Sequence, residues 1–379
     1  MSLRDVAIVG VYATEQAKSL DRTTFDISWE AVSGALADAG LTSDDVDGAA
    51  VTWPGPGGLL GDVASWGRFL GRDGLSWVAD GPGATGGVRA VVSAAAAINA
   101  GLCETVVIGG GRAGVDAERR VLHQFSDPWG AWGVTVYALI AQRHMYEFGT
   151  KPEHLAKVAA TIRNHGHANP EAVMSGRGPY TVDDVLGSPI VATPFHLLDV
   201  SIFAQGGAAV VLTTVERARD LRQQPIAILG AGYDIRQANY VNPPIYADVG
   251  QIGKKAAERV FGQAGVGPED IDVFCLYDPN SFEIIRQFET LGLCKEGEGG
   301  PFVADNDLSI QGNVPTNPDG GLLSYAWCHL QTQTMKVIES VKQLRGQAGP
   351  RQVNDASVAI AANAGAGSHH WEMALFGRA

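Results

Sequence analysis

The sequence predicts an α/β protein that contains one strand–helix–strand unit twice. Short apolar segments alternate with amphipathic helix patterns, which is typical of largely parallel sheets covered by helices. The segments 36–47 (LADAGLTSDDVD) and 261–272 (FGQAGVGPEDID) also match, and each places a glycine where a helix would end. We therefore expect an N-terminal half, residues 1–222, and a related C-terminal half, residues 223–379.

Each half is expected to begin with a strand, an amphipathic helix, the shared turn and a further strand. In chain order these elements are 6–13, 27–36 and 48–53 in the first half, and 226–233, 252–261 and 273–278 in the second. Both halves then continue with a glycine-rich turn that opens a helix, followed by two strands. The helices are 86–100 and 320–344, and the strands are 105–110, 208–215, 357–364 and 371–377.

Residues 112–200 have no counterpart in the second half. They hold aromatic and polar segments such as FSDPWGAWG, and a helix is predicted near 134–148. Long connections in compact proteins usually carry function, so we interpret this segment as an insertion that caps a pocket. A bulky, sterol-like or aromatic acyl group would suit its tryptophans, Trp129 and Trp132.

Composition and charge exclude several classes of protein. A net charge of −13 is unsuited to binding a nucleic-acid backbone. The most apolar helix, 88–100, is too short to insert into a membrane, and the first residues begin a strand at once, which predicts a cytoplasmic protein. The four cysteines form no CxxC pair, so we expect buried free thiols, with neither a metal site nor disulfides.

Four segments resemble the motifs of one known family. They are ADGPGATGGVRA at 79–90, YDPNSFEIIRQFETLGLCKEGEGGPFV at 277–303, NPDGGLLSYAWCH at 317–329 and ANAGAGS at 362–368. In these segments the chain resembles the thiolase superfamily, most closely the sterol-carrier-type thiolases often called lipid-transfer proteins. The resemblance implies a duplicated five-layer αβαβα fold of two mixed sheets with a capping insertion. It also implies a homodimer and an acyl-CoA substrate, with coenzyme A as part of the substrate and no separate cofactor.

The catalytic residues of thiolases are missing from the matching positions. The position of the nucleophilic cysteine falls on Gly83, that of the Gly-His-Pro histidine on Trp327, and that of the second cysteine on Asn363. The resemblance therefore implies the thiolase fold without its nucleophile. Backbone N–H groups at Gly83 and Gly365 could still polarise a thioester oxygen, with Trp327 and Asn363 beside the substrate.

An oxyanion hole without a nucleophile suits retro-aldol cleavage of a 3-hydroxyacyl-CoA, which needs no covalent intermediate. The sequence resembles the steroid side-chain-cleaving aldolases, in which a thiolase-like subunit pairs with a DUF35 protein that contains an OB fold. Those enzymes also have Tyr-Asp at positions 277–278, which predicts Tyr277 as the base and places Asp278 beside it. Their second tyrosine matches Trp327, so His329 and Tyr325 are the candidates for binding or protonating the substrate.

Simpler roles compete with several of these assignments. Tyr277 could be a packing residue, and Asp278 most simply caps the helix that begins with PNSFEIIRQF. His369 and His370 would face opposite sides of a strand, so they do not suggest a metal pair, although the resemblance allows one of them to face the pocket. The GxGxxG match at 109–114 lacks the acidic strand end of a dinucleotide site, and the resemblance explains it as a strand end at a dimer interface.

Three functional hypotheses follow. The leading one is a carbon–carbon lyase that acts on a 3-hydroxyacyl-CoA, with a steroid or other bulky acyl group. The second is a non-catalytic subunit that binds acyl-CoA or supports a DUF35 partner. The third is an atypical acyltransferase, which would require a displaced nucleophile such as Cys328 in the cavity.

Overall fold

Nine strands form one mixed sheet in the computed structural model, which describes residues 2–52, 66–67, 70–79, 86–114, 133–235, 250–326, 328, 331–364 and 370–379. Within these ranges the strand order is β3-β2-β4-β7-β1-β8-β11-β10-β9. The first half contributes β1 (Val6–Ala13), β2 (Gly48–Thr52), β3 (Trp77–Val78), β4 (Thr105–Arg112) and β7 (Gly206–Thr214). The second half contributes β8 (Ile226–Ile235), β9 (Val273–Cys275), β10 (Val358–Asn363) and β11 (His370–Arg378).

The same four-strand unit occurs twice in this sheet. In the first half β2 and β4 are parallel, while β4 with β7 and β7 with β1 are antiparallel. In the second half β9 and β10 are parallel, while β10 with β11 and β11 with β8 are antiparallel. The two predicted mixed sheets meet where β1 pairs with β8, Ala7 opposite Ala227 and Ile8 opposite Ile226. The topology confirms the predicted duplication.

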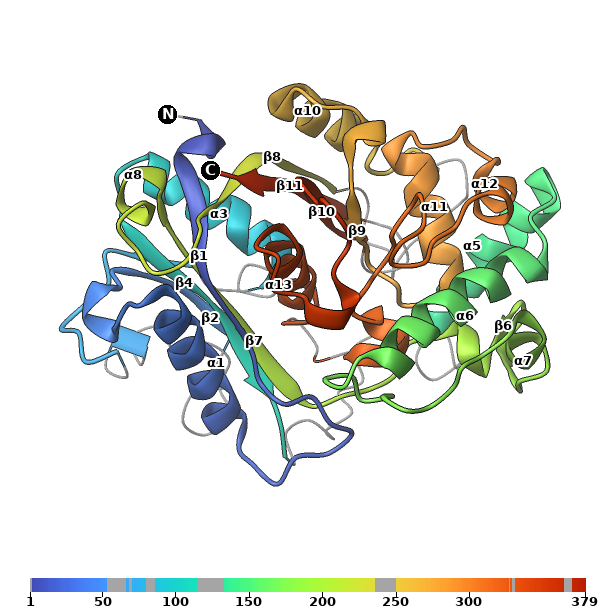
Figure 1. Cartoon of the computed structure of the whole chain (residues 1–379), viewed down its shortest axis with the longest axis horizontal. Coiled ribbons are helices and arrows are strands. Elements are labelled where there is room, and N and C mark those ends of the chain that lie inside the picture. Colours follow the sequence, from blue (N-terminus) through green and yellow to red (C-terminus); the bar gives the residue numbers. More distant parts are fainter. Residues whose placement is uncertain are drawn as a thin grey trace.

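Helices cover the outer faces of both halves and fill the space between them. α1 (Thr24–Ala39) covers the first half and α10 (Lys254–Ala264) covers the second, while α8 (Val215–Ala218) is a single turn. α3 (Gly87–Asn99) and α13 (Thr332–Leu344) contact each other and strands of both halves, so they form the middle layer of the predicted αβαβα arrangement (Figure 1). None of the helices in the described ranges has the length and apolar character needed to cross a bilayer.

The repeated sequence segment forms the same turn in both halves. α1 ends at Gly40 with a φ of 74°, and α10 ends at Gly265 with a φ of 69°. These are left-handed conformations, in which glycine avoids the steric penalty of a Cβ atom. Each glycine is followed by a short 3-10 turn that holds the acidic pair, Ser43–Asp45 in one half and Pro268–Asp270 in the other. The acidic pairs are therefore turn residues, as the repeat predicts.

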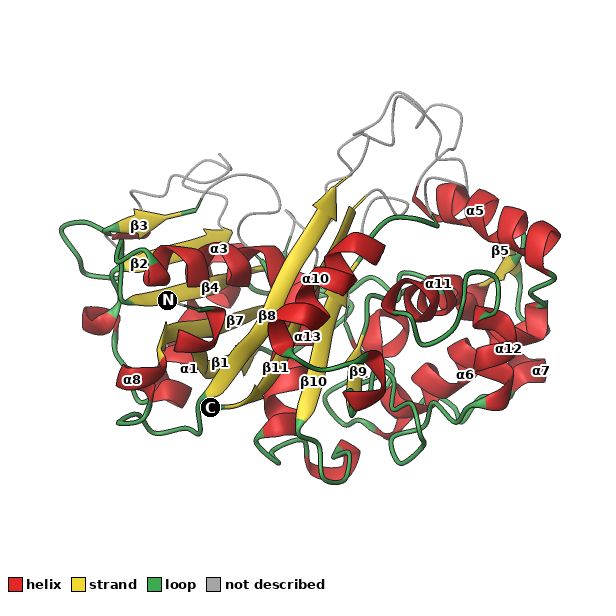
Figure 2. Cartoon of the chain, turned by 90° about the horizontal axis from the view of Figure 1, so that it is seen from above, coloured by secondary structure: helices red, strands yellow, loops and turns green. Residues whose placement is uncertain are grey.

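The predicted insertion forms a helical layer beside the second half (Figure 2). Its elements are α5 (Gly133–Phe148), α6 (Pro152–Ala168), α7 (Val182–Leu186) and the short hairpin β5 (Ile190–Ala192) and β6 (Phe195–His196). α6 packs on α11 (Ser281–Leu291) and α12 (Gly299–Asp305), which belong to the second half. The helix expected near 134–148 is present as α5, and α6 is a second long helix that the sequence patterns did not single out.

The predicted continuous helix over 320–344 is wrong in its first part. Gly321–Tyr325 form one π-helical turn, and α13 begins only at Thr332. Gly320 and Gly321 start the turn with φ values of 99° and 57°. A Cβ atom on Gly321 would lie 2.0 Å from the carboxylate of Asp278. The close approach of Asp278, which follows β9, therefore requires glycine at position 321.

Candidate active site

Tyr277 lies two residues after β9, which ends at Cys275 and is shorter than the predicted strand 273–278. Its main-chain N–H donates to Gln287 Oε1 at 3.3 Å, and its carbonyl accepts from Gln287 Nε2 at 2.6 Å. Gln287 is fully buried on α11. The half-buried Tyr277 ring packs against the core cluster shared by the second half and the insertion. One buried amide therefore fixes the backbone on both sides of this tyrosine.

Asp278 is fully buried and directed away from solvent. Its carboxylate accepts from the N–H groups of Leu322 at 3.0 Å and Leu323 at 3.3 Å, and it lies 3.1 Å from Lys336 Nζ. The predicted role of Asp278 as the cap of the following helix is wrong, because Asn280 caps α11. Asp278 instead caps the distant π-helical turn, which links the end of β9 to the segment before α13.

Lys336 supplies the countercharge for this buried carboxylate. It projects from α13 and only 2% of its side chain is exposed. Burial lowers the pKa of Lys336, but the charges of Asp278 and Asp319 and the hydrogen bond to Asp278 together raise that pKa above its usual value. The pair is therefore a fixed ionic link between α13 and the strand end that carries Tyr277.

Asn363 ends β10 at the position where thiolases carry their second cysteine. Its side chain is buried, with the residue 1% exposed, and neither its Oδ1 nor its Nδ2 has a hydrogen-bond partner among the described residues. Buried amides are almost always satisfied, because an unpaired one costs about 1–3 kcal/mol. The insertion anchors the next residue, Ala364, because the hydroxyl of Tyr137 on α5 donates a hydrogen bond to the Ala364 carbonyl at 2.9 Å. An unsatisfied amide in a braced strand end is suited to binding a ligand.

Tyr325 lies in the central core at the end of the π-helical turn. It is 5% exposed, and burial, together with the charges of Glu171 and Asp319, raises its pKa well above the usual value. It lines a cavity of about 330 Å³ with Glu171 and Lys342. Tyr325 and Tyr277 pack in different core clusters, and the high pKa of Tyr325 makes it a hydrogen-bond or proton donor and not a base.

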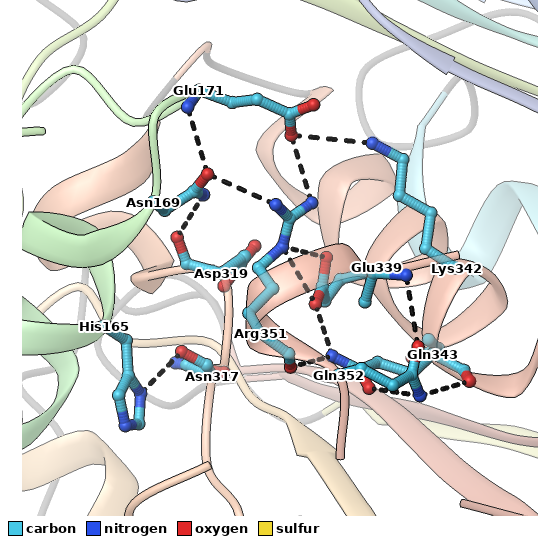
Figure 3. A network of polar contacts seen from close by, with 12 residues as sticks. His165, Asn169, Glu171, Asn317, Asp319, Glu339, Lys342, Gln343, Arg351 and Gln352 are labelled. Atoms are coloured by element: carbon cyan, nitrogen blue, oxygen red, sulfur yellow. Dashed lines mark hydrogen bonds and ion pairs between the residues drawn. The ribbon is translucent and has the colours of Figure 1, made fainter. Parts of the chain in front are cut away.

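A polar network centred on Arg351 supports the segment on which Tyr325 lies (Figure 3). Arg351 donates to Glu339 at 3.2 Å, to Asn169 at 3.2 Å and to Glu171 at 3.0 Å. Asn169 in turn donates to the carbonyl of Asp319 at 2.8 Å. The network joins the end of α6 to α13 and to the loop before the π-helical turn, so its role is structural.

Asn317 holds the same loop against β9. Its backbone has a φ of 47°, its side chain accepts from the Leu276 N–H at 2.7 Å, and its carbonyl lies 3.1 Å from His165 Nδ1. Burial lowers the pKa of His165, which favours the neutral ring. Gln287, Lys336, Arg351 and His165 were not singled out from the sequence, because their partners lie far along the chain.

Several predicted site residues lie outside the described parts of the chain. These are Gly83, Trp327, His329 and Gly365, together with Trp129 and Trp132 of the insertion. The oxyanion hole formed by the two glycines and the role of His329 therefore stay predictions.

All four thiols are poorly suited to act as nucleophiles. Cys103, Cys275 and Cys328 are buried, and Cys294 is half-buried. Burial raises the pKa of Cys103, Cys294 and Cys328 to about 12, and it raises the pKa of Cys275 further. Since the thiolate is the reactive form, no cysteine here resembles an activated nucleophile. Cys328, the candidate for a displaced nucleophile in the acyltransferase hypothesis, is equally unsuited.

The chain is similar to known proteins over almost its whole length. Residues 249–378 match the family described as Thiolase C-terminal domain-like. A steroid side-chain-cleaving aldolase from Thermomonospora curvata is 33% identical over 95% of both chains, and an acetyl-CoA acetyltransferase from Methanothermobacter thermautotrophicus is 31% identical over 96% of this chain and 97% of its own. The solved structure of an Ltp2-ChsH2(DUF35) aldolase superimposes with a TM-score of 0.84 at 30% identity, covering 99% of this chain and 98% of that one.

The chain belongs to the thiolase superfamily, in the lipid-transfer-protein branch that includes the steroid side-chain-cleaving aldolases. The predicted family and fold are confirmed by these similarities. So is the predicted class of enzyme, a carbon–carbon lyase built on a thiolase fold.

Proposed function

We propose that the protein cleaves the bond between Cα and Cβ of a 3-hydroxyacyl-CoA by a retro-aldol reaction. A base removes the proton of the 3-hydroxyl group, the Cα–Cβ bond breaks, and a carbonyl product leaves. The electron pair of that bond passes into the thioester as an enolate, which then takes up a proton at Cα. The observation that carries this proposal is the state of the thiols: all four cysteines have raised pKa values in a fold whose usual chemistry needs a thiolate.

Tyr277 is the base in this proposal. It lies two residues after β9, Gln287 braces its backbone, and the neighbouring carboxylate of Asp278 is paired with Lys336. The ion pair reduces the effect of the Asp278 charge, which would otherwise oppose ionisation of the phenol. A tyrosine with a pKa near 10 needs such an environment to act as a base near neutral pH.

The developing enolate requires hydrogen-bond donors at the thioester oxygen. Asn363 can supply one, because its buried Nδ2 has no partner within the described part of the protein. The backbone N–H groups at Gly83 and Gly365 are the other proposed donors. Such preorganised donors stabilise charge that appears only during the reaction. His329 or Tyr325 would bind the substrate or donate a proton to it, and the raised pKa of Tyr325 favours its protonated form.

The substrate and partners are also part of the proposal. A steroid or other bulky acyl group is supported by the similarity to a steroid side-chain-cleaving aldolase, and a DUF35 partner by the similarity to the solved Ltp2-ChsH2(DUF35) aldolase. We further propose a cytoplasmic homodimer. Its contact cannot be the expected strand pairing through residues 105–110, because β4 is hydrogen-bonded to β2 on one side and to β7 on the other. Coenzyme A enters only as part of the substrate.

The experiment that tests this function is purification of the chain from its native host, with any bound partner, followed by assays on 3-hydroxyacyl-CoA thioesters that differ in the acyl group. We expect release of a ketone or aldehyde together with a shortened acyl-CoA. A complex that binds these thioesters and cleaves none of them would instead support a non-catalytic, scaffolding subunit.

The acyltransferase hypothesis is a second candidate, because one similar relative is an acetyl-CoA acetyltransferase. It requires an acyl group to be carried on the protein, and the thiols with raised pKa values argue against it. The two candidates differ in whether a covalent adduct forms.

A further inference from the structure

Arg89, His370 and Glu372 form a charged cluster beside the proposed site. Glu372 Oε1 lies 3.2 Å from His370 Nδ1 and is also ion-paired with Arg89 Nη2. The same Arg89 nitrogen lies 3.5 Å from His370 Nδ1. Only 2% of the Glu372 side chain is exposed, whereas His370 keeps 22% and Arg89 24%. The carboxylate of Glu372 is thus the buried part of the cluster, and the imidazole ring of His370 is partly exposed to solvent.

The cluster lies on the same face of the sheet as Asn363. Asn363 and Glu372 are directly opposite each other on β10 and β11. His370 is two residues before Glu372 on β11, so its side chain projects from the same face, diagonal to Asn363 at a Cα separation of roughly 7–8 Å. Arg89 is in the first turn of α3, which shows that this face looks onto the middle layer.

Unsatisfied buried groups on two elements indicate that a ligand belongs here. Arg89 Nε and both polar atoms of the Asn363 amide have no hydrogen-bond partner in the part of the chain that the structure describes. The start of α3 is also tied to α13, since the Gly87 N–H donates to Thr334 Oγ1 at 2.9 Å. Burial raises the pKa of Glu372, but the hydrogen bond and charge of His370 and the charge of Arg89 hold it below its usual value. The carboxylate is therefore ionised and can orient the imidazole.

The retro-aldol reaction needs a proton donor at Cα, in addition to the groups that bind the substrate and its oxygen atoms. The enolate must be protonated at Cα, and thiolases use their second cysteine for such proton transfers. Asn363 occupies that position, and a neutral amide neither gives nor takes a proton near neutral pH. A titratable group on the same face of the sheet as Asn363 could take over the proton transfer of the missing thiol.

We propose that His370 is that group, an inference that rests on the proposed retro-aldol function. Its protonated imidazole donates the Nε2 proton to Cα of the thioester enolate, a C–H bond forms, and the enolate electron pair becomes part of that bond. The thioester carbonyl is restored and His370 is left neutral. Glu372 acts as a positioning residue that holds Nδ1, and Arg89 balances its charge. The partly exposed ring regains its proton from water.

The test uses the reverse of this step and needs no cleavable substrate. The full-length protein, with any co-purified partner, is incubated with acetyl-CoA in D₂O, and deuterium at the acetyl carbon is followed by mass spectrometry. We expect the wild-type protein to catalyse this exchange and His370→Gln to lose about 10²–10⁴-fold of its rate. His154→Gln, which changes a half-buried histidine of α6, is the matched control and should exchange at the wild-type rate.

Chemical rescue separates catalysis from folding. In His370→Ala, added imidazole should restore part of the exchange rate, which a merely structural role would not allow. Wild-type exchange no faster than in buffer, a His370→Gln rate above a third of wild type, or no rescue by imidazole would each overturn the proposal. If exchange depends on His370 while no 3-hydroxyacyl-CoA is cleaved, the proton-transfer role stands and the retro-aldol function fails.

Discussion

The two four-strand units share one topology but differ in what their strand ends carry. In the second unit Tyr277 follows β9, Asn363 ends β10 and His370 begins β11. In the first unit β4 ends with Gly109–Gly111 and Arg112, and β7 begins with Gly206 and Gly207. A Cβ atom on Gly109 would lie 2.5 Å from the Cβ of Ala209. At Gly109 the first unit is closed by tight backbone packing, whereas the second unit places Asn363 and His370 at its strand ends.

This difference shows how duplication can separate structure from chemistry. The shared strands and the repeated turn supply a scaffold in both halves. The reactive side chains Tyr277, Asn363 and His370 come from the second copy, and Ala364 is braced by Tyr137 of the insertion. The first copy adds Arg89 of α3 to the charged cluster. Substitutions at the second unit's strand ends should therefore affect the reaction, whereas substitutions in the shared turn should affect stability alone.

The largest effect is expected for Tyr277→Phe. The change removes only the hydroxyl group, so the fold should persist, with a cost below about 1.5 kcal/mol. Loss of a general base should lower the rate about 10²–10⁴-fold, or about 3–5.5 kcal/mol of barrier. The measurement is the cleavage rate on an identified substrate, with the melting temperature as control. Retention of more than a third of the activity would make Tyr277 a packing residue.

The next effect concerns the buried ion pair. α13 carries Lys336 four residues after its first residue, whereas α3 carries the apolar Val91 at the same place. Lys336→Met leaves Asp278 buried without its countercharge and should lower the free energy of unfolding by about 3–5 kcal/mol. The double variant Lys336→Met/Asp278→Leu should recover part of this loss, measured by denaturant unfolding. Equal stability of the single variant and the wild type would show that the pair is not a structural link.

Asn363→Ala should separate activity from stability. Loss of one oxyanion donor is expected to reduce the rate about 10²–10³-fold. Removing a buried amide that has no partner among the described residues should leave the free energy of unfolding unchanged or raise it by about 1 kcal/mol. Kinetics and denaturant unfolding on the same samples provide the comparison. A large loss of stability would mean that the amide is satisfied within the folded protein.

The smallest effects test the repeat itself. Gly40→Ala and Gly265→Ala place a Cβ atom in the left-handed conformation and should each cost about 1–2 kcal/mol of stability. The cost should be greater for Gly40, because its Cβ would lie 3.1 Å from Arg222 Cβ, while no atom of the described residues lies within 4 Å at Gly265. Cleavage rates should be unchanged in both variants. A lower melting temperature for Gly265→Ala than for Gly40→Ala would contradict the tighter packing inferred around Gly40.

Local patterns explain which features were predictable from the sequence. The strands, the two glycine-capped helices and the duplicated turn follow from short-range periodicity, and all are present. The π-helical turn at Gly321–Tyr325 depends on Asp278, which lies 44 residues from Leu322, so a helix over 320–344 was the natural expectation. Lys336 and Arg351 are buried charges whose partners are also distant in sequence, and no local pattern marks them.

The candidate site was predictable only where a motif marks a strand end. Tyr277 and Asn363 follow from the resemblance, because each lies in a matched segment, Asn363 at the end of β10 and Tyr277 just beyond β9. The cluster of Arg89, His370 and Glu372 joins α3 to β11, and only the folded chain brings these residues together. Two adjacent histidines on a strand are expected to face opposite sides of the sheet. The sequence does not show which side chain from another element will contact either ring.

The central claim is that this thiolase fold works without a covalent acyl intermediate. Intact-mass spectrometry of the full-length protein after incubation with acetyl-CoA or acetoacetyl-CoA tests it most directly. We predict an unchanged mass, because Gly83 stands at the nucleophile position and the pKa of Cys328 is raised to about 12. A stoichiometric gain of about 42 Da, one acetyl group, located on Cys328 would contradict the account and establish an acyltransferase mechanism.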